Sequence, residues 1–198
     1  AKVIHINYKS AQVDQVYFPQ IEIVGDIALS VDALADALGS RLDIDLEDFE
    51  KVRDNVKGKI FPLDEKPVFP MRPQNIVSAI RNLMGYHDII ALDNGVYKIW
   101  FARNYLAFQP NTILLDNALA TMGAGLPSAM LAAMIHPNRK VMSICGDGGF
   151  MMNSQEIETA VRLNLNLVVL ILNDNSYGMI RWKQAGSGFW GGGIPPSI

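Results

Sequence analysis

The chain has 198 residues, which is long enough for one full domain and part of another. Apolar residues make up 49% of it and charged residues 19%, so a large buried core can form, which argues against global disorder. The net charge of −3, with no basic stripe, gives no electrostatic reason to expect nucleic acid or an anionic membrane as a partner.

The cellular compartment is indicated by what the sequence lacks. The single cysteine, Cys145, cannot form an internal disulfide, which favours a reducing cytoplasm. The longest apolar run, residues 165–172, is interrupted by Asn166 and is far shorter than the roughly 18 residues that span a membrane. No signal-like segment precedes the strand-like residues 3–6, and we expect a cytoplasmic protein whose chain is cut from a longer polypeptide.

Residues 1–40 have the pattern of a strand, a loop, a second strand and a helix. The expected elements are strands at residues 2–7 and 21–24 and a helix at residues 31–38. Ser30 is expected to be the N-cap of this helix, and Gly39 to end it. Residues 41–70 are charged and then proline-rich, which favours a surface helix followed by an extended linker between domains.

From residue 71 onward, strands alternate with helices, beginning with a helix that starts at Pro73 and stops before Gly85. The strands are expected at residues 88–92, 112–115, 140–145 and 167–172, with further helices at about 126–135 and 154–163. Asn153 and Glu156 are expected to form a capping box for the last helix. The last strands are continuous apolar runs, typical of strands buried on both faces, so the sequence predicts an α/β fold with a parallel sheet. The glycine-rich residues 185–198 are expected to be a flexible tail.

The strongest local feature is Gly146-Asp147-Gly148-Gly149, which follows a buried strand and precedes a helix. Ligands of open parallel sheets bind at the carboxyl ends of strands, where glycines let backbone N–H groups approach phosphate oxygens. Asp147 could hold a hard cation there. Taken alone, a turn that closes the strand explains the motif equally well.

A second feature favours the site over the turn. Twenty-four residues separate Gly148 from Asn173-Asp174, which ends the next buried strand. A right-handed crossover would place Asp147 and Asp174 on neighbouring strands, facing one crevice. Two carboxylates, backbone carbonyls and a diphosphate would supply the oxygens that Mg²⁺ requires.

Other sites have weaker support. The chain has neither the glycine fingerprint of dinucleotide-binding folds nor a GxxxxGK[ST] loop, which disfavours an NAD domain. We interpret Gly123-Ala124-Gly125 as close backbone packing or approach to a ligand ring. The three histidines are isolated and lack metal-ligand spacing, so packing explains them better. They are His5, His87 and His136.

The paired motif resembles the thiamine-diphosphate motif of the pyruvate decarboxylase and acetolactate synthase superfamily. Residues 121–127 are similar to the family's TMGxGLP segment, residues 150–161 to its post-motif helix, and residues 3–38 to the end of its central domain. The resemblance covers residues 2–184 and is strongest over 110–184. It implies a parallel sheet flanked by helices, preceded by the tail of a Rossmann-like central domain. The implied division is 1–40 for that tail, 41–70 for the linker and 71–198 for an incomplete thiamine-diphosphate- and Mg²⁺-binding domain.

The resemblance also assigns roles to residues. It implies that Asp147, Asp174 and the Ser176 carbonyl bind Mg²⁺, and that Gly148 and Gly149 meet the diphosphate through backbone N–H groups. Met122 would support the bent conformation of the cofactor. The remaining implied cofactor contacts are Tyr97, Gly146, Tyr177, Gly178 and Met179.

Three departures from the family pattern bear on function. Most relatives have Asn where Asp174 stands, and Asp favours the catabolic acetolactate synthases. Many biosynthetic relatives have Gly-Gln-His where this chain has Gly95-Val96-Tyr97, so Tyr97 is either a hydrogen-bond donor or a packed aromatic. Residues 179–184 differ from the biosynthetic pattern and leave the acceptor substrate open; beyond Gln184 the resemblance ends.

The implied activity is that of an acetolactate synthase, a transferase that decarboxylates pyruvate and condenses the product with a second 2-keto acid. It would serve branched-chain amino acid biosynthesis or an acetoin and butanediol pathway. In this family the activating glutamate comes from the pyrimidine-binding domain of a neighbouring subunit, so we expect a homodimer or homotetramer and assign no catalytic residue here. Glu156 and Glu158 are better explained by capping and the helix dipole.

We therefore expect the isolated chain to be inactive and to bind the cofactor weakly. The alternatives are another thiamine-diphosphate-dependent decarboxylase or carboligase, or a non-catalytic fragment of one. The residues say nothing for or against FAD, because most of the family's central domain lies outside them.

Overall fold

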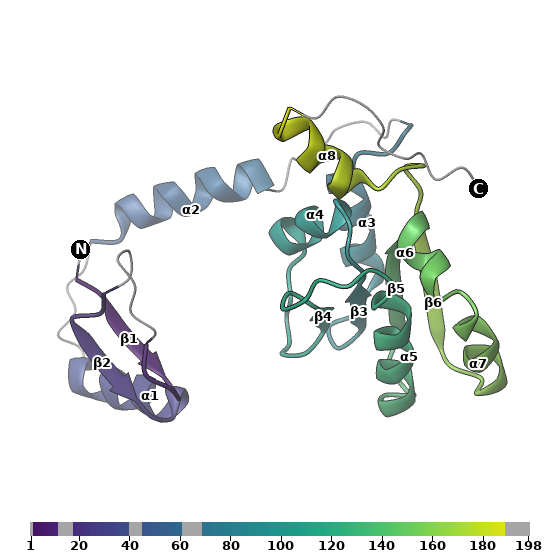
Figure 1. Cartoon of the computed structure of the whole chain (residues 1–198). Helices are drawn as coiled ribbons and strands as arrows, with labels where there is room; N and C mark the ends of the chain where they lie inside the picture. Colours follow the sequence, from purple (N-terminus) through teal and green to yellow (C-terminus); the bar gives the residue numbers. More distant parts are fainter. Residues whose placement is uncertain (1, 12–17, 40–44, 61–68, 189–198) are drawn as a thin grey trace. The chain divides into compact units, whose positions relative to one another are not determined.

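The computed structural model describes residues 2–11, 18–39, 45–60 and 69–188 (Figure 1). The chain divides into two compact units, residues 1–53 and 54–198. The domain boundaries expected from the sequence stay predictions. Within the described residues, no helix is both long and apolar enough to cross a membrane.

The first unit contains two short parallel strands and a helix. They are β1 (Ile4–Asn7), β2 (Ile21–Val24) and α1 (Ile27–Leu38). Both strands agree with the sequence prediction, but the helix begins four residues earlier than expected, so Ser30 as its N-cap was wrong. Asp26 is the N-cap instead, because its carboxylate accepts a hydrogen bond from the Leu29 N–H at 2.9 Å. That bond also holds the pKa of Asp26 below its ordinary value.

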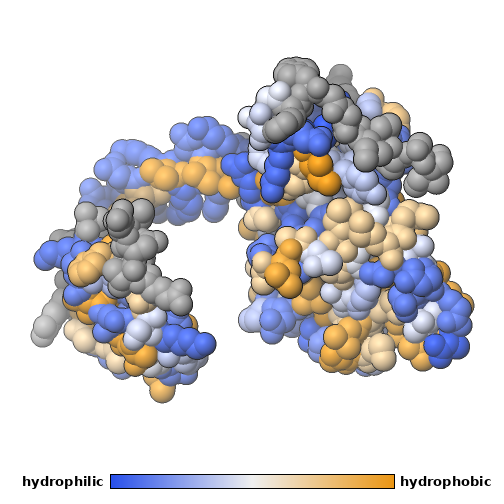
Figure 2. Space-filling model, in the orientation of Figure 1, coloured by the Kyte–Doolittle hydropathy of each residue, from blue (hydrophilic) through white to orange (hydrophobic). Residues whose placement is uncertain are grey.

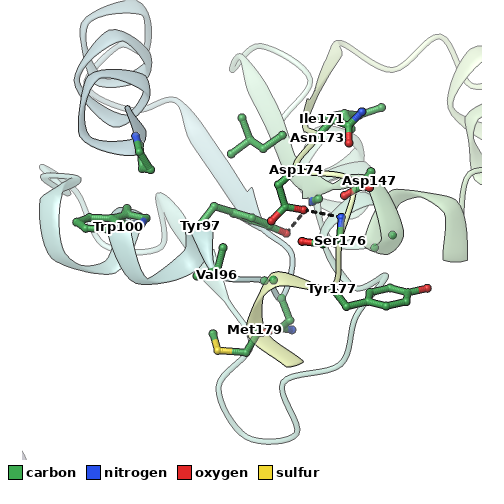
Figure 3. Close-up of a pocket in the computed structure, with 18 of the residues that line it drawn as sticks. Val96, Tyr97, Trp100, Asp147, Ile171, Asn173, Asp174, Ser176, Tyr177 and Met179 are labelled. Carbon is green, nitrogen blue, oxygen red and sulfur yellow. Dashed lines mark hydrogen bonds between the residues drawn. The ribbon is translucent and has the colours of Figure 1, made fainter. Parts of the chain in front are cut away.

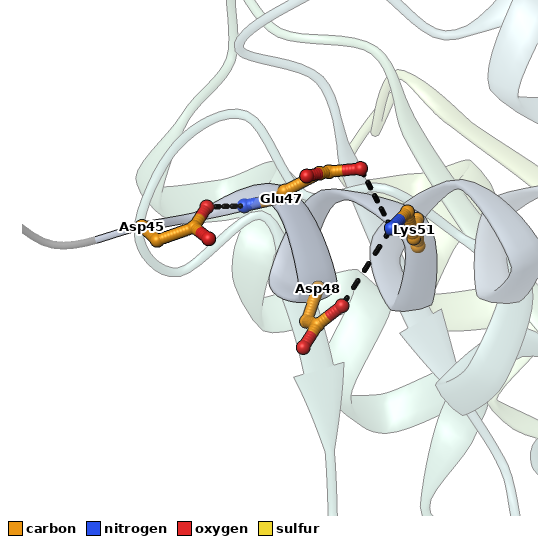
Figure 4. Close-up of polar contacts among 4 residues, drawn as sticks. All are labelled: Asp45, Glu47, Asp48 and Lys51. Carbon is orange, nitrogen blue, oxygen red and sulfur yellow. Dashed lines mark hydrogen bonds and ion pairs between the residues drawn. The ribbon is translucent and has the colours of Figure 1, made fainter.

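Helix α2 (Glu47–Ile60) is a surface helix, as its charge pattern predicted, since none of its residues is buried. Asp45 accepts a hydrogen bond from the Glu47 N–H, and Lys51 pairs with Glu47 at 2.7 Å and with Asp48 at 3.7 Å (Figure 4). These exposed pairs each contribute only about 0.3–0.5 kcal/mol. Figure 2 shows this helix as mainly hydrophilic, with apolar side chains along one side.

The second unit is built on a four-stranded parallel sheet in the order β4-β3-β5-β6. Its strands are β3 (Ile89–Leu92), β4 (Ile113–Leu115), β5 (Val141–Gly146) and β6 (Leu167–Leu172). Its helices are α3 (Pro73–Leu83), α4 (Tyr97–Asn104), α5 (Gly125–Ile135), α6 (Asp147–Met152), α7 (Glu156–Arg162) and α8 (Gly178–Gly186). This confirms the predicted α/β fold with a parallel sheet flanked by helices (Figure 1).

The side-chain alternation of β3 divides the core into two layers. Ile90 and Leu92 pack with the buried side chains of α3 and α4 on one face. Ile89 and Ala91 pack with the alanines of α5 on the other face. Since both faces are covered, β3 is entirely buried and anchors the unit.

Two details of the predicted pattern were wrong. Strand β6 is only partly buried, with Val168 at 55% exposure and Ile171 at 41%, because it lies at the edge of the described sheet. The capping box does not form, since the N-cap of α7 is Gln155 and no side chain caps it, while the Asn153 amide donates at 2.7 Å to the Gly123 carbonyl outside that helix.

Helices α4, α6 and α8 were not predicted. Their sequences give weak helix signals: α6 holds two glycines in six residues, and α4 has buried residues without a clear apolar stripe. Of the expected tail at 185–198, Ala185 and Gly186 complete α8, while residues 189–198 lie outside the described part of the chain.

The loop between β4 and α5 contains a strained residue. Ala120 has a φ of 51°, in the left-handed region that a β-carbon disfavours by roughly 1–2 kcal/mol. Ala120 is itself exposed, and its neighbour Leu119 is 87% exposed, so packing does not explain the conformation. The Asp116 carboxylate holds the loop by accepting hydrogen bonds from the N–H groups of Ala118 and Thr121.

We predict that Ala120→Gly raises the free energy of unfolding by about 0.5–1 kcal/mol, because glycine adopts positive φ without the steric cost. Urea unfolding of both proteins would measure the change. Ala118→Gly, two residues away at an ordinary φ, is the control and should lower stability or leave it unchanged. Equal effects of the two substitutions would contradict the prediction.

Candidate active site

The register between β5 and β6 brings the two acidic motifs together. Gly146 pairs with Leu172, so these strands end level with one another. Asp147 begins α6 directly after β5, and Asp174 follows β6 by two residues. A cavity of about 440 Å³ opens at this edge (Figure 3).

All eleven residues singled out from the sequence line this one cavity. They are Tyr97, Met122, Gly146, Asp147, Gly148, Gly149, Asp174, Ser176, Tyr177, Gly178 and Met179. They come from four separate segments of the chain, which shows that the fold gathers them. Lining a cavity does not by itself assign the individual roles, and those stay predictions.

The two carboxylates differ in their surroundings. Asp147 is half-buried, whereas Asp174 is exposed and its Oδ1 accepts a hydrogen bond from the Ser176 N–H at 3.1 Å. Asp174 thus forms a turn, which was the alternative interpretation of this motif, and it also lines the cavity (Figure 3). The two interpretations are compatible, since an Asx turn uses only one carboxylate oxygen.

The donor set suits a hard cation only in combination with a ligand. Within the described ranges, no group of three His, Cys, Asp or Glu side chains could hold a metal ion. Asp147, Asp174 and the Ser176 carbonyl are all oxygen donors, the type that Mg²⁺ prefers. The remaining positions would need water or an oxygen-rich ligand such as a diphosphate, and Mg²⁺ is characteristically bound this way.

Tyr97 is both a packed aromatic and a possible hydrogen-bond donor. Its ring is 8% exposed, and its hydroxyl accepts a hydrogen bond from the Gly146 N–H at 2.9 Å. Burial raises the pKa of this phenol well above 10.0, and the charge of Asp93 raises it further. The hydroxyl therefore keeps its proton, which is free to be donated.

The glycines of the site are required by packing as well as by any ligand. A β-carbon on Gly148 would lie 2.5 Å from the Tyr177 ring, and one on Gly149 would overlap the Asp93 carboxylate. A β-carbon on Gly178 would lie 2.7 Å from Asp174 Oδ2. Gly148 and Gly149 also lie in the first turn of α6, where N–H groups have no acceptor within the helix.

The predicted close packing of Gly123-Ala124-Gly125 is confirmed. A β-carbon on Gly125 would lie 2.6 Å from Asp93 Cβ, and Gly123 has a φ of 85°. Met122, immediately before this turn, is half-buried and lines the cavity.

The apolar wall of the cavity was not predicted from the sequence. It is formed by side chains of α3, α4 and the segment before α3, including Phe69, Ile76, Trp100 and Phe101. The buried Asp93 at the end of β3 was also missed, although a polar residue directly after a buried strand is the signal that identified Asp147.

Cys145 does not belong to the chemistry of the cavity. It is fully buried in β5, and its thiol lies 3.2 Å from the Ser143 hydroxyl. Burial raises its pKa to about 11, so the reactive thiolate is scarce at neutral pH.

The sequence of this region matches a known family. The model described as "Thiamine pyrophosphate enzyme, C-terminal TPP binding domain" matches residues 93–191, half of the chain. The chain belongs to the thiamine pyrophosphate (TPP) enzymes. Thiamine pyrophosphate is the thiamine diphosphate of the sequence motif, and all eleven residues singled out from the sequence lie inside the matched TPP-binding domain.

Three relatives show how far this similarity extends. The chain is 35% identical over 191 residues to a catabolic acetolactate synthase of Raoultella terrigena, covering 93% of this chain and 34% of that protein. It is 33% identical over 187 residues to an acetolactate synthase of Bacillus subtilis, covering 92% and 32%. It is 36% identical over 115 residues to the putative thiamine pyrophosphate-containing protein YdaP of Bacillus subtilis, covering 58% and 20%. The chain spans about a third of the length of the first two of these curated relatives.

We predict that Gly149→Ala destabilises the TPP-binding domain by about 2 kcal/mol, because the added methyl group would overlap the buried Asp93 carboxylate. Thermal or urea unfolding would measure this loss. Gly58→Ala in α2 is the matched control: no atom lies within 4 Å of its added β-carbon, and it should stabilise the helix by about 0.5–1 kcal/mol. Two substitutions of the same sign and size would refute the packing argument.

Proposed function

We propose that this chain is the thiamine-diphosphate- and Mg²⁺-binding part of an acetolactate synthase. The observation that carries the proposal is the placement of Asp147 and Asp174 at the level ends of β5 and β6, around a cavity that Tyr97 and Met122 also line. The similarity to acetolactate synthases over most of the chain supports it.

The cofactor, when bound, supplies a nucleophilic carbon that lets pyruvate lose CO₂ and join a second 2-keto acid. The residues of this chain would bind and orient it. Asp147, Asp174 and the Ser176 carbonyl would hold Mg²⁺, and the first N–H groups of α6 would meet the diphosphate. Tyr97 would donate its hydroxyl proton at the diphosphate end, and Met122 would support the rings with the apolar wall around them.

No residue of this chain is assigned as a catalytic acid or base. Glu158 is exposed and pairs with Arg162 at 3.2 Å. Glu156 lies in the first turn of α7, where its negative charge interacts favourably with the helix dipole. The activating carboxylate is proposed to come from the pyrimidine-binding domain of a second subunit in a homodimer or homotetramer. The isolated chain should accordingly not turn over pyruvate.

Within the acetolactate synthases, we favour the catabolic branch, which would lead to acetoin and butanediol rather than branched-chain amino acids. Asp174 in place of the usual Asn supports this assignment, and so does the match to the catabolic enzyme of Raoultella terrigena. A cytoplasmic location fits the buried, reduced Cys145.

A second candidate is another thiamine-diphosphate-dependent carboligase. The similarity to YdaP, whose name specifies only the cofactor, covers 58% of this chain and favours a site that is common to several reactions. Assay of the full-length enzyme with pyruvate, reading acetolactate formation, would decide between the two.

We predict that thiamine diphosphate with Mg²⁺ raises the melting temperature of the chain. At a hundredfold excess over Kd the stabilisation is about 2.7 kcal/mol, which corresponds to roughly 5–10 °C for a chain of this size. Asp147→Ala should abolish the shift, because the cation loses a ligand. Asp36→Ala, which removes an exposed carboxylate on α1, should leave it intact. No shift at saturating cofactor would instead support a non-catalytic fragment that has lost the site.

We predict that Tyr97→Phe weakens cofactor binding about tenfold, because it removes the donor and leaves the Gly146 N–H without its acceptor. Titration calorimetry would measure the affinity. Since the pKa of Tyr97 is raised by burial, the difference between the two proteins should persist up to about pH 10.

Tyr105→Phe is the control for this experiment. The Tyr105 hydroxyl is buried and has no hydrogen-bond partner among the described residues, so its removal should leave affinity unchanged and stability unchanged or higher. Equal loss of affinity in both variants would contradict a specific role for Tyr97.

A further inference from the structure

We propose that Asp93 is a positioning residue for the cavity, and that with Asn94 it clamps the backbone on both sides of Met122. Its importance for ligand binding rests on the function proposed above, whereas the clamp itself is a property of the unliganded chain. Asp93 is not among the residues that line the cavity, so it acts through those that do.

Asp93 lies at the junction of the segments that carry the site. Its own N–H donates at 2.9 Å to the Ile144 carbonyl of β5, which ties the end of β3 to the strand that leads into Gly146. Its side chain is completely buried. Carboxylate oxygen Oδ1 accepts from the Asn94 N–H at 2.7 Å, and Oδ2 accepts from the Gly123 N–H at 3.1 Å.

The neighbouring Asn94 makes the complementary contact. Its amide Nδ2 donates at 2.6 Å to the Thr121 carbonyl, immediately before Met122. The Gly123 N–H, immediately after Met122, is bound by Asp93. Two adjacent side chains at the end of β3 therefore hold the peptide groups on either side of one cavity residue.

The same carboxylate also spaces the Gly148-Gly149 turn. Asp93 lies so close to Gly125 and Gly149 that neither position has room for a β-carbon. The Asp93 side chain thus separates the start of α5 from the start of α6. The length of this side chain sets how near Met122 comes to the glycines of α6. Met122 Cε lies 3.5 Å from the position of a β-carbon on Gly148, so these two parts of the cavity do meet.

A buried carboxylate lowers the stability of the fold unless its oxygens accept hydrogen bonds. Burial of an ionised or polar group without hydrogen bonds disfavours folding by several kcal/mol, and an apolar side chain would fill the space without that penalty. The carboxylate offers two acceptors to two N–H groups from separate segments, which a leucine or alanine cannot do. The need to fix the backbone beside Met122 therefore accounts for an aspartate, rather than an apolar residue, at position 93.

The test is Asp93→Asn, which keeps the size of the side chain but replaces one acceptor oxygen by an NH₂ donor. With ¹³C-methyl-labelled methionine, the NMR signal of Met122, assigned through Met122→Leu, should move in this variant without any ligand. Hydrogen exchange of the Gly123 amide or of the Asn94 amide should become at least about tenfold faster, because the variant keeps one acceptor oxygen for two N–H groups. Affinity for thiamine diphosphate with Mg²⁺ should fall about tenfold, as for other residues that orient a ligand-binding group.

Ser143→Ala is the matched control, because Ser143 is equally buried but contacts Cys145 rather than the Met122 loop. It should leave the Met122 signal and the cofactor affinity unchanged even if it lowers the melting temperature. A merely structural role for Asp93 would move the melting temperature of both variants and the Met122 signal of neither. An unmoved Met122 signal in Asp93→Asn would overturn the proposal.

Two further measurements cover a variant that does not fold. In the unaltered chain, the Gly123 amide should exchange more slowly than the amides of the exposed Leu119 and Ala120; exchange at the same rate would overturn the clamp. Asn94→Ala, at a half-buried position, should also move the Met122 signal. If the unaltered chain shows no Mg²⁺-dependent cofactor binding while the Met122 signal still moves in Asp93→Asn, the proposed function fails and the clamp stands.

Discussion

The backbone pairing of β3, β5 and β6 is the constraint on which the site depends. Parallel hydrogen bonds place Gly146 opposite Leu172 and Leu92 opposite Ile144, so three strands end at one edge of the sheet. The polar residues that follow each strand are thereby brought together, although 80 residues lie between Asp93 and Asp174 in the sequence. A slip of one residue between β5 and β6 would reverse the faces of their side chains and separate the acidic motifs. The core opposes such a slip, because side chains of β5 and β6 also pack in the clusters on both faces of the sheet.

The strands were predictable, because buried parallel strands are short apolar runs that end at polar residues. All four strands of the larger unit and the juxtaposition of Asp147 and Asp174 follow from this pattern and from crossover handedness. Helix boundaries were less predictable, because competing contacts decide them. Asn153 could cap α7, but its amide binds the Gly123 carbonyl, and that acceptor comes from a loop 30 residues earlier in the sequence. Likewise, Asp26 rather than Ser30 caps α1, since both are suitable residue types and only the turn geometry selects between them.

The apolar wall and the role of Asp93 could not be read from local pattern at all. Ile76, Trp100 and Phe101 look like ordinary core residues of amphipathic helices, and only the space left between those helices and the strand ends makes some of them cavity residues. Asp93 was hidden for a different reason. Its partners are backbone N–H groups, above all that of Gly123, and a sequence carries no sign of which N–H groups need an acceptor.

The glycines illustrate how packing and ligand binding can select the same residue. At Gly149 the buried Asp93 carboxylate excludes a side chain whether or not a ligand is present, whereas at Gly148 the excluding group is the ring of Tyr177, which itself lines the cavity. Glycine at position 149 is therefore required by packing in the protein interior, whereas glycine at position 148 is required by packing within the cavity. The polar groups of the cavity follow the strand ends, and side chains of α3 and α4 add an apolar wall. Such a division suits a ligand with a charged end and an aromatic body, which describes the cofactor of the family rather than the substrate. The chemistry of this cavity therefore suits the cofactor of the family to which the chain belongs.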